Sequence, residues 1–246
     1  MIAEQSSYDT VNKQVQKSYG EGELNTWKTI LQKHALVRRE QIIDLFHQGL
    51  EELDITEDRI PRLEEINEKL MAKTGFKGVC VEGLEEGNTF FPMTARREFP
   101  VGNFIRDDID LNYTPAPDIV HDVYGHLPFF IDKDYADFCQ KFGEMACEFY
   151  DNPEIFRQFE RLFWFTIEFG MIKTEKGLRI FGAGIASSIG ECNYALSGEP
   201  ELVPFDLDTV RHQDFRIDQM QPKLFVLEST EQLYNCLDEF YEKVSQ

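Results

Sequence analysis

The stretch PDIVHDVYGHLP, residues 117–128, decides how this chain folds, because it carries two of the chain's five histidines. Asp118 is typical of a helix cap, and the final proline is typical of a helix end, so the stretch predicts one short helix. On an ideal α-helix, positions five apart lie ~140° apart around the axis. His121 and His126 can therefore face one metal ion only if the helix unwinds near Gly125.

A histidine pair has several interpretations. Neutral imidazole is a good ligand for divalent transition metals. A bare pair is more often two ordinary core or surface histidines. The spacing is one residue too long for the HExxH pattern, which argues against a zinc peptidase.

A third ligand must come from elsewhere in the chain. In FWFTIEFG, residues 163–170, Glu168 is the single acid in an apolar run. Burying an unpaired carboxylate is costly, and either a metal ion or an ion pair with Arg161 or Arg179 would relieve the cost. Two histidines and one carboxylate suit non-haem Fe(II), with zinc as the rival.

Outward from this centre, apolar residues recur mainly at helical spacing, so we expect a mainly α fold with a few short strands. The expected helices cover residues 23–53, 56–73, 132–150, 153–173, 187–196 and 229–244. Strands are expected near 75–82 and 178–181, and residues 83–116 are expected to form an irregular, functional loop. Residues 1–22 are predicted to be a flexible N-terminal arm, followed by a single domain over 23–246.

Composition restricts the partners. Acidic residues outnumber basic ones 45 to 25, for a net charge of −20. That field repels nucleic acid and anionic lipid, and no apolar run is long enough to span a membrane. The five cysteines form no CxxC pair, and the first residues lack a signal-peptide pattern, so we expect free thiols and a cytoplasmic location.

Arg106 is a candidate anion clamp, because guanidinium binds a carboxylate through two parallel hydrogen bonds. A surface ion pair with Asp107 or Asp108 is an equal alternative. The loop 113–117 precedes the first histidine by a few residues and is expected to form part of the site wall.

Four blocks resemble the catalytic domain of the tetrahydropterin-dependent aromatic amino acid hydroxylases, in order, wording and separation. They are residues 114–130, 164–170, 181–191, and 200–204 with 221–222. The resemblance implies that family's catalytic-domain fold, with Fe(II) bound by His121, His126 and Glu168. It implies a monooxygenase that converts L-phenylalanine and O2 to L-tyrosine with tetrahydrobiopterin or a related reduced pterin, as in phenylalanine catabolism. The chain is similar to bacterial members without extra domains, so we expect a monomer.

The resemblance also implies the residues around the iron. The implied pterin site consists of Phe90, Gly83, Leu84, Asp122 and Phe163. The implied substrate site consists of Arg106, Tyr113, Thr114, Pro115, Trp164, Gly184 and Ser187. Animal members carry Glu at the Asp122 position, so a bridging water is expected here. Tyrosine hydroxylases carry Asp at the position aligned with Ile217, and an apolar residue there favours phenylalanine.

Two alternatives stay open. One is a related hydroxylase that acts on tryptophan or gives meta-tyrosine. The other is a non-catalytic helical module with a structural zinc ion.

Overall fold

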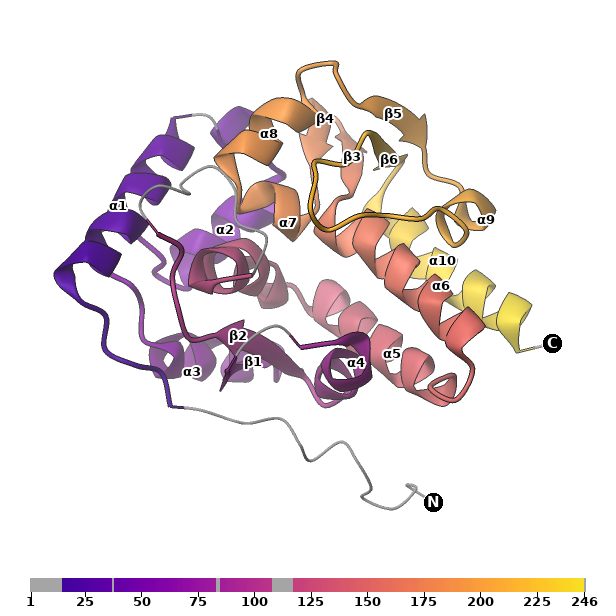
Figure 1. The fold of residues 1–246 in the computed structure, drawn as a ribbon, viewed down its shortest axis with the longest axis horizontal. Helices are drawn as coiled ribbons and strands as arrows, with labels where there is room; N and C mark the ends of the chain where they lie inside the picture. Colours follow the sequence, from indigo (N-terminus) through magenta and orange to yellow (C-terminus); the bar gives the residue numbers. More distant parts are fainter. Residues whose placement is uncertain (1–14, 37, 83–84, 108–116, 246) are drawn as a thin grey trace.

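The computed structural model describes residues 15–36, 38–82, 85–107 and 117–245, and most of these residues lie in helices (Figure 1). The longer helices are α1 (Glu21–Ala35), α2 (Asp44–Glu52), α3 (Leu63–Lys73), α4 (Gly87–Ala95), α5 (Lys133–Glu148), α6 (Pro153–Phe163) and α10 (Thr230–Val244). The short ones are η2 (Arg38–Glu40), η3 (Val120–His126), η4 (Leu127–Ile131), η5 (Trp164–Glu168), α7 (Ala183–Ala186), α8 (Ile189–Ala195) and α9 (Leu207–Val210). The mainly helical fold class is confirmed.

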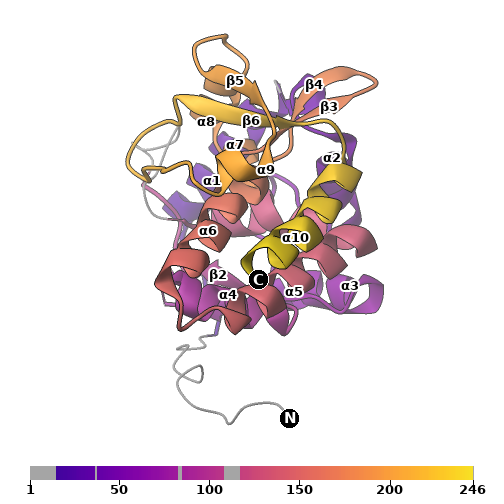
Figure 2. The same cartoon turned by 90° about the vertical axis from the view of Figure 1, so that its right-hand side faces the viewer.

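The strands form two separate sheets, which lie towards opposite ends of the molecule in both ribbon views (Figures 1 and 2). The strands are β1 (Lys77–Val81), β2 (Glu98–Gly102), β3 (Met171–Thr174), β4 (Gly177–Ile180), β5 (Glu201–Pro204) and β6 (Lys223–Leu227). β1 and β2 form a parallel pair. The other sheet has the order β4-β3-β6-β5, in which β3 and β4 are antiparallel and β6 is parallel to both neighbours.

Side-chain caps begin three of the helices that the sequence predicts. Asp132 accepts a hydrogen bond from the Tyr135 backbone N–H at 2.8 Å and begins α5. Asn152 begins α6 in the same way, and Ser229 begins α10 by accepting from the Gln232 N–H at 3.2 Å. A capping oxygen satisfies a donor that has no partner within the helix, so these starts can be predicted from local sequence.

Three predicted helix boundaries are wrong. The helix expected over 23–53 is divided into α1 and α2, with η2 between them. The helix expected from Thr56 begins only at Leu63, because Pro61 disfavours helical geometry at the residue before it. The helix expected over 153–173 ends with η5, and β3 follows at once.

The segment expected to be an irregular loop, residues 83–116, contains α4 and β2 in its described part. Strands β5 and β6 were not predicted either. The described residues of the predicted arm also contact the body of the protein. The Gln16 side chain accepts from the Leu63 N–H at 2.7 Å and donates to the Pro61 carbonyl at 3.1 Å.

One hydrophobic cluster connects elements from α1 to α10 and anchors the segment that carries the two histidines. Tyr124 of η3 is fully buried, with edge-to-face ring contacts to Trp27 at 6.5 Å and to Phe46 at 5.3 Å. Its hydroxyl accepts a hydrogen bond from Arg38 at 2.7 Å. These contacts fix the orientation of η3 in the core.

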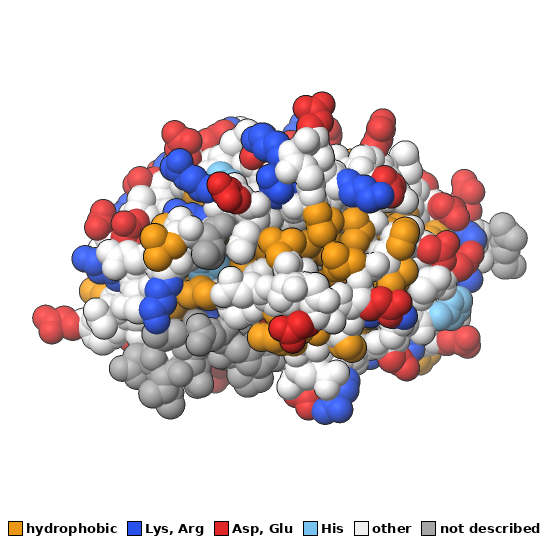
Figure 3. Space-filling model, turned by 90° about the horizontal axis from the view of Figure 1, so that it is seen from above, with side chains coloured by type: hydrophobic (Ala, Val, Ile, Leu, Met, Phe, Trp, Pro, Cys, Tyr) orange, Lys and Arg blue, Asp and Glu red, His pale blue; other side chains and the backbone are white. Residues whose placement is uncertain are grey.

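Charged and apolar side chains lie side by side on part of the surface (Figure 3). Seen from above, apolar side chains gather among Lys, Arg, Asp and Glu (Figure 3). On the four-stranded sheet, a shallow depression is lined by Leu178, Leu202 and Val226. Among the described residues, no helix is long and apolar enough to cross a membrane.

Candidate metal centre

His121 and His126 both lie on η3, which is a turn of π-helix. In a π-helix the backbone hydrogen bonds join residues i and i+5, so residues five apart lie one turn apart on the same side. Asp118 begins the turn by accepting from the His121 N–H at 3.0 Å. The expectation that the helix must unwind is therefore wrong. The helix widens instead, and the widening brings the two imidazoles together.

Close packing against α7 holds the first imidazole in place. A Cβ atom added at Gly125 would lie 2.8 Å from Ser187 Cβ and 2.9 Å from the Ala183 carbonyl oxygen, so only glycine fits there. The same approach brings Ser187 Oγ to 3.2 Å from Nδ1 of His121. A partner on the second ring nitrogen orients an imidazole so that its Nε2 is presented to a ligand.

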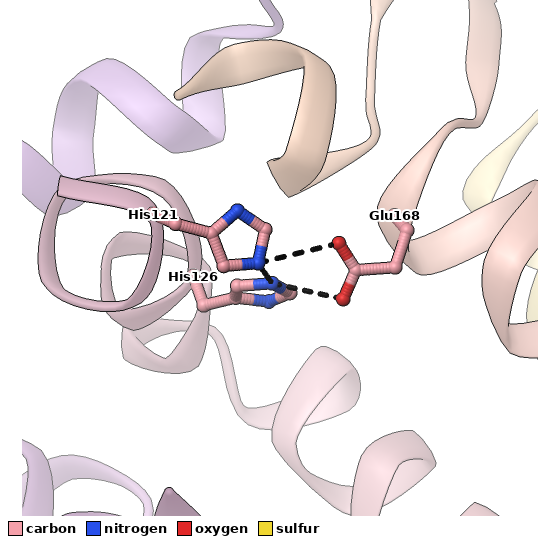
Figure 4. A group of neighbouring side chains, drawn as sticks. All are labelled: His121, His126 and Glu168. Atoms are coloured by element: carbon pink, nitrogen blue, oxygen red, sulfur yellow. Dashed lines mark hydrogen bonds and ion pairs between the residues drawn. The ribbon is translucent and has the colours of Figure 1, made fainter. Parts of the chain in front are cut away.

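The third member of the group is Glu168, at the end of the second π-helical turn, η5. Its Oε1 lies 3.0 Å from His126 Nε2, and its Oε2 lies 3.6 Å from His121 Nε2. The two Nε2 atoms are 3.1 Å apart. The three side chains point towards one another from different elements (Figure 4). Among the described residues, this is the group of His, Cys, Asp and Glu whose donor atoms could hold one metal ion.

Burial and charge set the protonation of this group. Burial lowers the pKa of His121 to about 4, which leaves its imidazole neutral at neutral pH. Burial opposes the ionisation of Glu168, but the two histidines outweigh it, and the pKa of Glu168 is lowered. The neutral His121 imidazole, the His126 imidazole and an ionised carboxylate form a set of ligand types that suits a divalent transition metal.

The alternative in which Glu168 pairs with an arginine is wrong. Arg161 pairs instead with Asp214, at 2.5 Å. Arg179 donates to the Leu178 carbonyl at 2.8 Å.

A cavity of about 440 Å³ is lined by all three of these side chains and by aromatic rings. On one side Phe90 and Phe163 meet edge to face, with their centroids 5.0 Å apart. On another side Trp164 stacks on Phe215, with centroids 4.2 Å apart and planes 11° apart. Rings in such positions provide flat, apolar walls for a planar ligand.

Arg106 lines the same cavity, and its partner differs from both predicted ones. It forms a buried, two-bonded ion pair with Asp118, with Nε–Oδ2 at 2.9 Å and Nη2–Oδ1 at 2.7 Å. The expected surface pair with Asp107 is therefore wrong, and Asp108 lies outside the described residues. This arrangement holds the guanidinium rigidly at the cavity wall.

The remaining predicted residues fall into two groups. Asp122, Gly184 and Ser187 line the cavity. Asp122 is buried and accepts from the Gly102 N–H at 2.7 Å, and burial raises its pKa. A second group of predicted residues lies outside the described part of the chain and consists of Gly83, Leu84, Tyr113, Thr114 and Pro115.

The cavity residues that the sequence did not predict include Phe215 and Glu191. Glu191 is a lone acid in the mostly apolar stretch 183–192, which is the same signal that identified Glu168. Nothing in the local sequence marks Phe215, whose role depends on stacking against Trp164.

The whole chain matches a known family. The model of the family "Biopterin-dependent aromatic amino acid hydroxylase" matches residues 2–246. Among curated proteins, a phenylalanine-4-hydroxylase of Chromobacterium violaceum is 39% identical over 212 residues, which cover 86% of this chain and 71% of that protein. A phenylalanine-4-hydroxylase of Pseudomonas aeruginosa is 36% identical over 221 residues, covering 90% and 84% of the two chains.

Solved structures of similar proteins also match this chain. A C. violaceum phenylalanine hydroxylase with bound iron(III) and oxidised 7,8-dihydrobiopterin has a TM-score of 0.89 at 36% identity, over 98% of this chain and 89% of that one. A structure of that enzyme with bound iron and phenylalanine has a TM-score of 0.87 at 34% identity, over 97% and 89%.

Proposed function

Because this chain belongs to the biopterin-dependent aromatic amino acid hydroxylases, we propose that it is a monooxygenase that converts L-phenylalanine to L-tyrosine with O2 and a tetrahydropterin. The observation that carries the proposal is the group of His121, His126 and Glu168 at the wall of an aromatic cavity. That group has the ligand types of a non-haem Fe(II) site with open positions.

In this proposal the three side chains hold Fe(II), and the donor set fits that ion. When bound, iron and reduced pterin together supply the activation of O2 that hydroxylation of an aromatic ring requires. His121 presents Nε2 because its Nδ1 contacts Ser187 Oγ. Glu168 remains ionised because its pKa is lowered, so it offers a charged oxygen to the ion.

Arg106 and the ring of Trp164 orient the amino acid. Asp118 fixes the guanidinium through Nε and Nη2, and among the described residues this leaves Nη1 for the substrate carboxylate. Trp164, stacked on Phe215, forms a rigid wall for the substrate ring. We assign the rest of the substrate pocket to Tyr113, Thr114, Pro115, Gly184 and Ser187.

Phe90 and Phe163 form the pterin wall, because both half-buried rings present apolar surface to the cavity. Asp122 offers a carboxyl group towards the pterin, directly or through water. Gly83 and Leu84 complete the assigned pterin site. The aromatic rings around these groups also keep bulk water from the reacting centre.

Phenylalanine as the substrate is the finer part of the proposal. It is supported by the similarity to several phenylalanine-4-hydroxylases at 34–39% identity and by the apolar residue Ile217 at the cavity. A related enzyme could instead hydroxylate tryptophan, or phenylalanine at the meta position. Chromatography of the product against para-tyrosine, meta-tyrosine and 5-hydroxytryptophan distinguishes these activities.

The test is a tyrosine-formation assay with Fe(II), a reduced pterin and L-phenylalanine. His121→Ala is expected to abolish turnover while the chain stays folded. His212→Ala is the matched control, because it removes an exposed imidazole far along the chain from the proposed ligands. Stoichiometric zinc with no oxygen consumption would favour the zinc-module alternative, and full activity of His121→Ala would refute the ligand assignment.

Three organisational features complete the proposal. We propose that residues 23–246 form one catalytic domain, which is supported by the single hydrophobic cluster. We propose a monomer, which a mass measurement in solution can test. We also propose a cytoplasmic location, which is supported by the free thiols of all five cysteines.

A further inference from the structure

Glu191, on α8, is a buried carboxylate without a partner. Glu191 is one of the residues that line the cavity, and only 2% of its surface is exposed. Neither carboxylate oxygen has a hydrogen-bond partner among the described residues. The one bond near it uses its backbone, because the Glu191 N–H donates to Ser188 Oγ at 3.2 Å. Most buried polar groups are satisfied, so an exception at a cavity wall needs an explanation.

Three other acids at or beside this cavity, Glu168, Asp118 and Asp122, each have a partner. Glu168 contacts both histidines. Asp118 pairs with Arg106, and Asp122 accepts from the Gly102 N–H. Glu191 therefore differs from these three acids. Its missing partner is a hydrogen-bond donor, which would have to come from a ligand bound in the cavity.

The charges of the cavity wall indicate which donor is missing. A free amino acid carries one carboxylate and one ammonium group. The proposed function gives Arg106 to the carboxylate but leaves the ammonium without an anion, because Glu168 is committed to the metal. Glu191 is an acid on the same cavity wall that is not used by any other described side chain.

We propose that Glu191 receives the α-ammonium group of the amino-acid substrate, opposite the Arg106 that holds its carboxylate. The inference rests on the proposed function and adds to it the residue that selects an amino acid over an aromatic acid. An ammonium group would give the buried carboxylate the charge-assisted hydrogen bond that it lacks among the described residues.

A metal ion is a poorer occupant for Glu191. Among the described residues, the group that could hold a metal consists of His121, His126 and Glu168, and it does not include Glu191. Water is the remaining alternative. It would satisfy the carboxylate but would give no preference for an ammonium group.

The experiment compares two ligands that differ only in the ammonium. L-phenylalanine and 3-phenylpropanoate share the ring and the carboxylate. Binding of each is measured by calorimetry to the Fe(II)-loaded protein with reduced pterin, in the absence of O2. Glu191→Gln keeps the shape of the side chain, and Glu199→Gln is the matched control because it removes an exposed acid just beyond the same helix.

We expect Glu191→Gln to weaken L-phenylalanine binding by about tenfold or more, since truncating one partner of a buried charge pair is costly. Binding of 3-phenylpropanoate should change by less than about twofold, and the Glu199→Gln control should match the wild type for both ligands. Glu191→Asp keeps the charge, and it should retain more of the preference for L-phenylalanine than Glu191→Gln does.

Each other outcome has a definite meaning. Equal weakening of both ligands in Glu191→Gln would show general damage to the pocket and overturn the inference, as would unchanged L-phenylalanine binding. If Glu191→Gln does not fold, the wild-type protein carries the test: it must bind L-phenylalanine more tightly than 3-phenylpropanoate, and equal binding of the two ligands overturns the inference. Wild-type protein that binds neither ligand and forms no tyrosine would refute the proposed function itself.

Discussion

Replacing Glu191 by Gln should stabilise the substrate-free protein at high pH. Burial is the cause that raises the pKa of Glu191, from 4.5 to about 7. The native state therefore binds this proton more tightly than the unfolded state, and stability falls as pH rises between these two values. This difference in the pKa of Glu191 corresponds to about 3 kcal/mol of stability above pH 7. Gln resembles the protonated acid, so the variant does not lose this free energy.

The assay is urea denaturation of the substrate-free, iron-loaded protein, followed by tryptophan fluorescence at several pH values. The variant should exceed the wild type in free energy of unfolding by about 3 kcal/mol near pH 8 and by almost nothing near pH 4.5. In a thermal scan this difference corresponds to roughly 2–4 °C for each kcal/mol. Glu199→Gln controls for the loss of one negative charge. A less stable variant at pH 8, or a difference that does not depend on pH, would refute the reasoning.

Three further predictions concern the metal site and the packing around it. Glu168→Gln removes the charged ligand, so we expect iron affinity to fall by at least about tenfold. Metal analysis measures the bound iron, and circular dichroism checks that the protein is folded. Full iron content would contradict the assignment. A methyl group in Gly49→Ala would lie 2.1 Å from the Pro128 carbonyl oxygen, so we expect a loss of about 1–3 kcal/mol in urea denaturation, and a neutral effect would show that α2 can move aside. Asp118→Asn leaves the buried Arg106 without its counter-charge. The free energy of unfolding should therefore fall by about 3–5 kcal/mol, and KM for L-phenylalanine should rise. If neither quantity changes, the pair does not position the guanidinium.

Features with local causes could be predicted from sequence. The start of α10 follows from Ser229, whose hydroxyl accepts from a backbone N–H only three residues on. The same holds for Asp132 at α5. The mainly helical fold follows from apolar residues at helical spacing. This spacing indicates a helix even when the element that packs against its buried face is not known.

Features with distant causes could not be predicted. β1 and β2 pair in parallel, with Lys77 opposite Glu98, and each strand alone is short and carries little pattern. Pro100 within β2 argued further against a strand. Strands β5 and β6 likewise depend on each other, with Leu202 opposite Leu224. Such pairing is decided by the tertiary fold and not by the segment.

The metal site shows the same difference between what could be predicted from sequence and what could not. The residue types of His121, His126 and Glu168 favoured a metal from sequence, because two imidazoles and a lone acid in an apolar run supply the ligands that a divalent transition metal needs. The geometry that unites them did not follow from sequence. An α-helix would place the two histidines on different sides, and only the π-helical turn η3 brings their Nε2 atoms to 3.1 Å.

Several departures from ordinary folding rules lie at or beside the metal site. The ligands lie on two π-helical turns, which are rare in proteins and frequent at functional sites. His126 Nδ1 and both oxygens of Glu191 are buried without a hydrogen-bond partner among the described residues. The unpartnered Glu191 carboxylate lowers the stability of the protein without substrate, and an ammonium group bound beside it would supply the missing donor. A site that is less stable when empty therefore gains affinity for its ligands, and this is why stability and binding should respond in opposite directions when Glu191 becomes Gln.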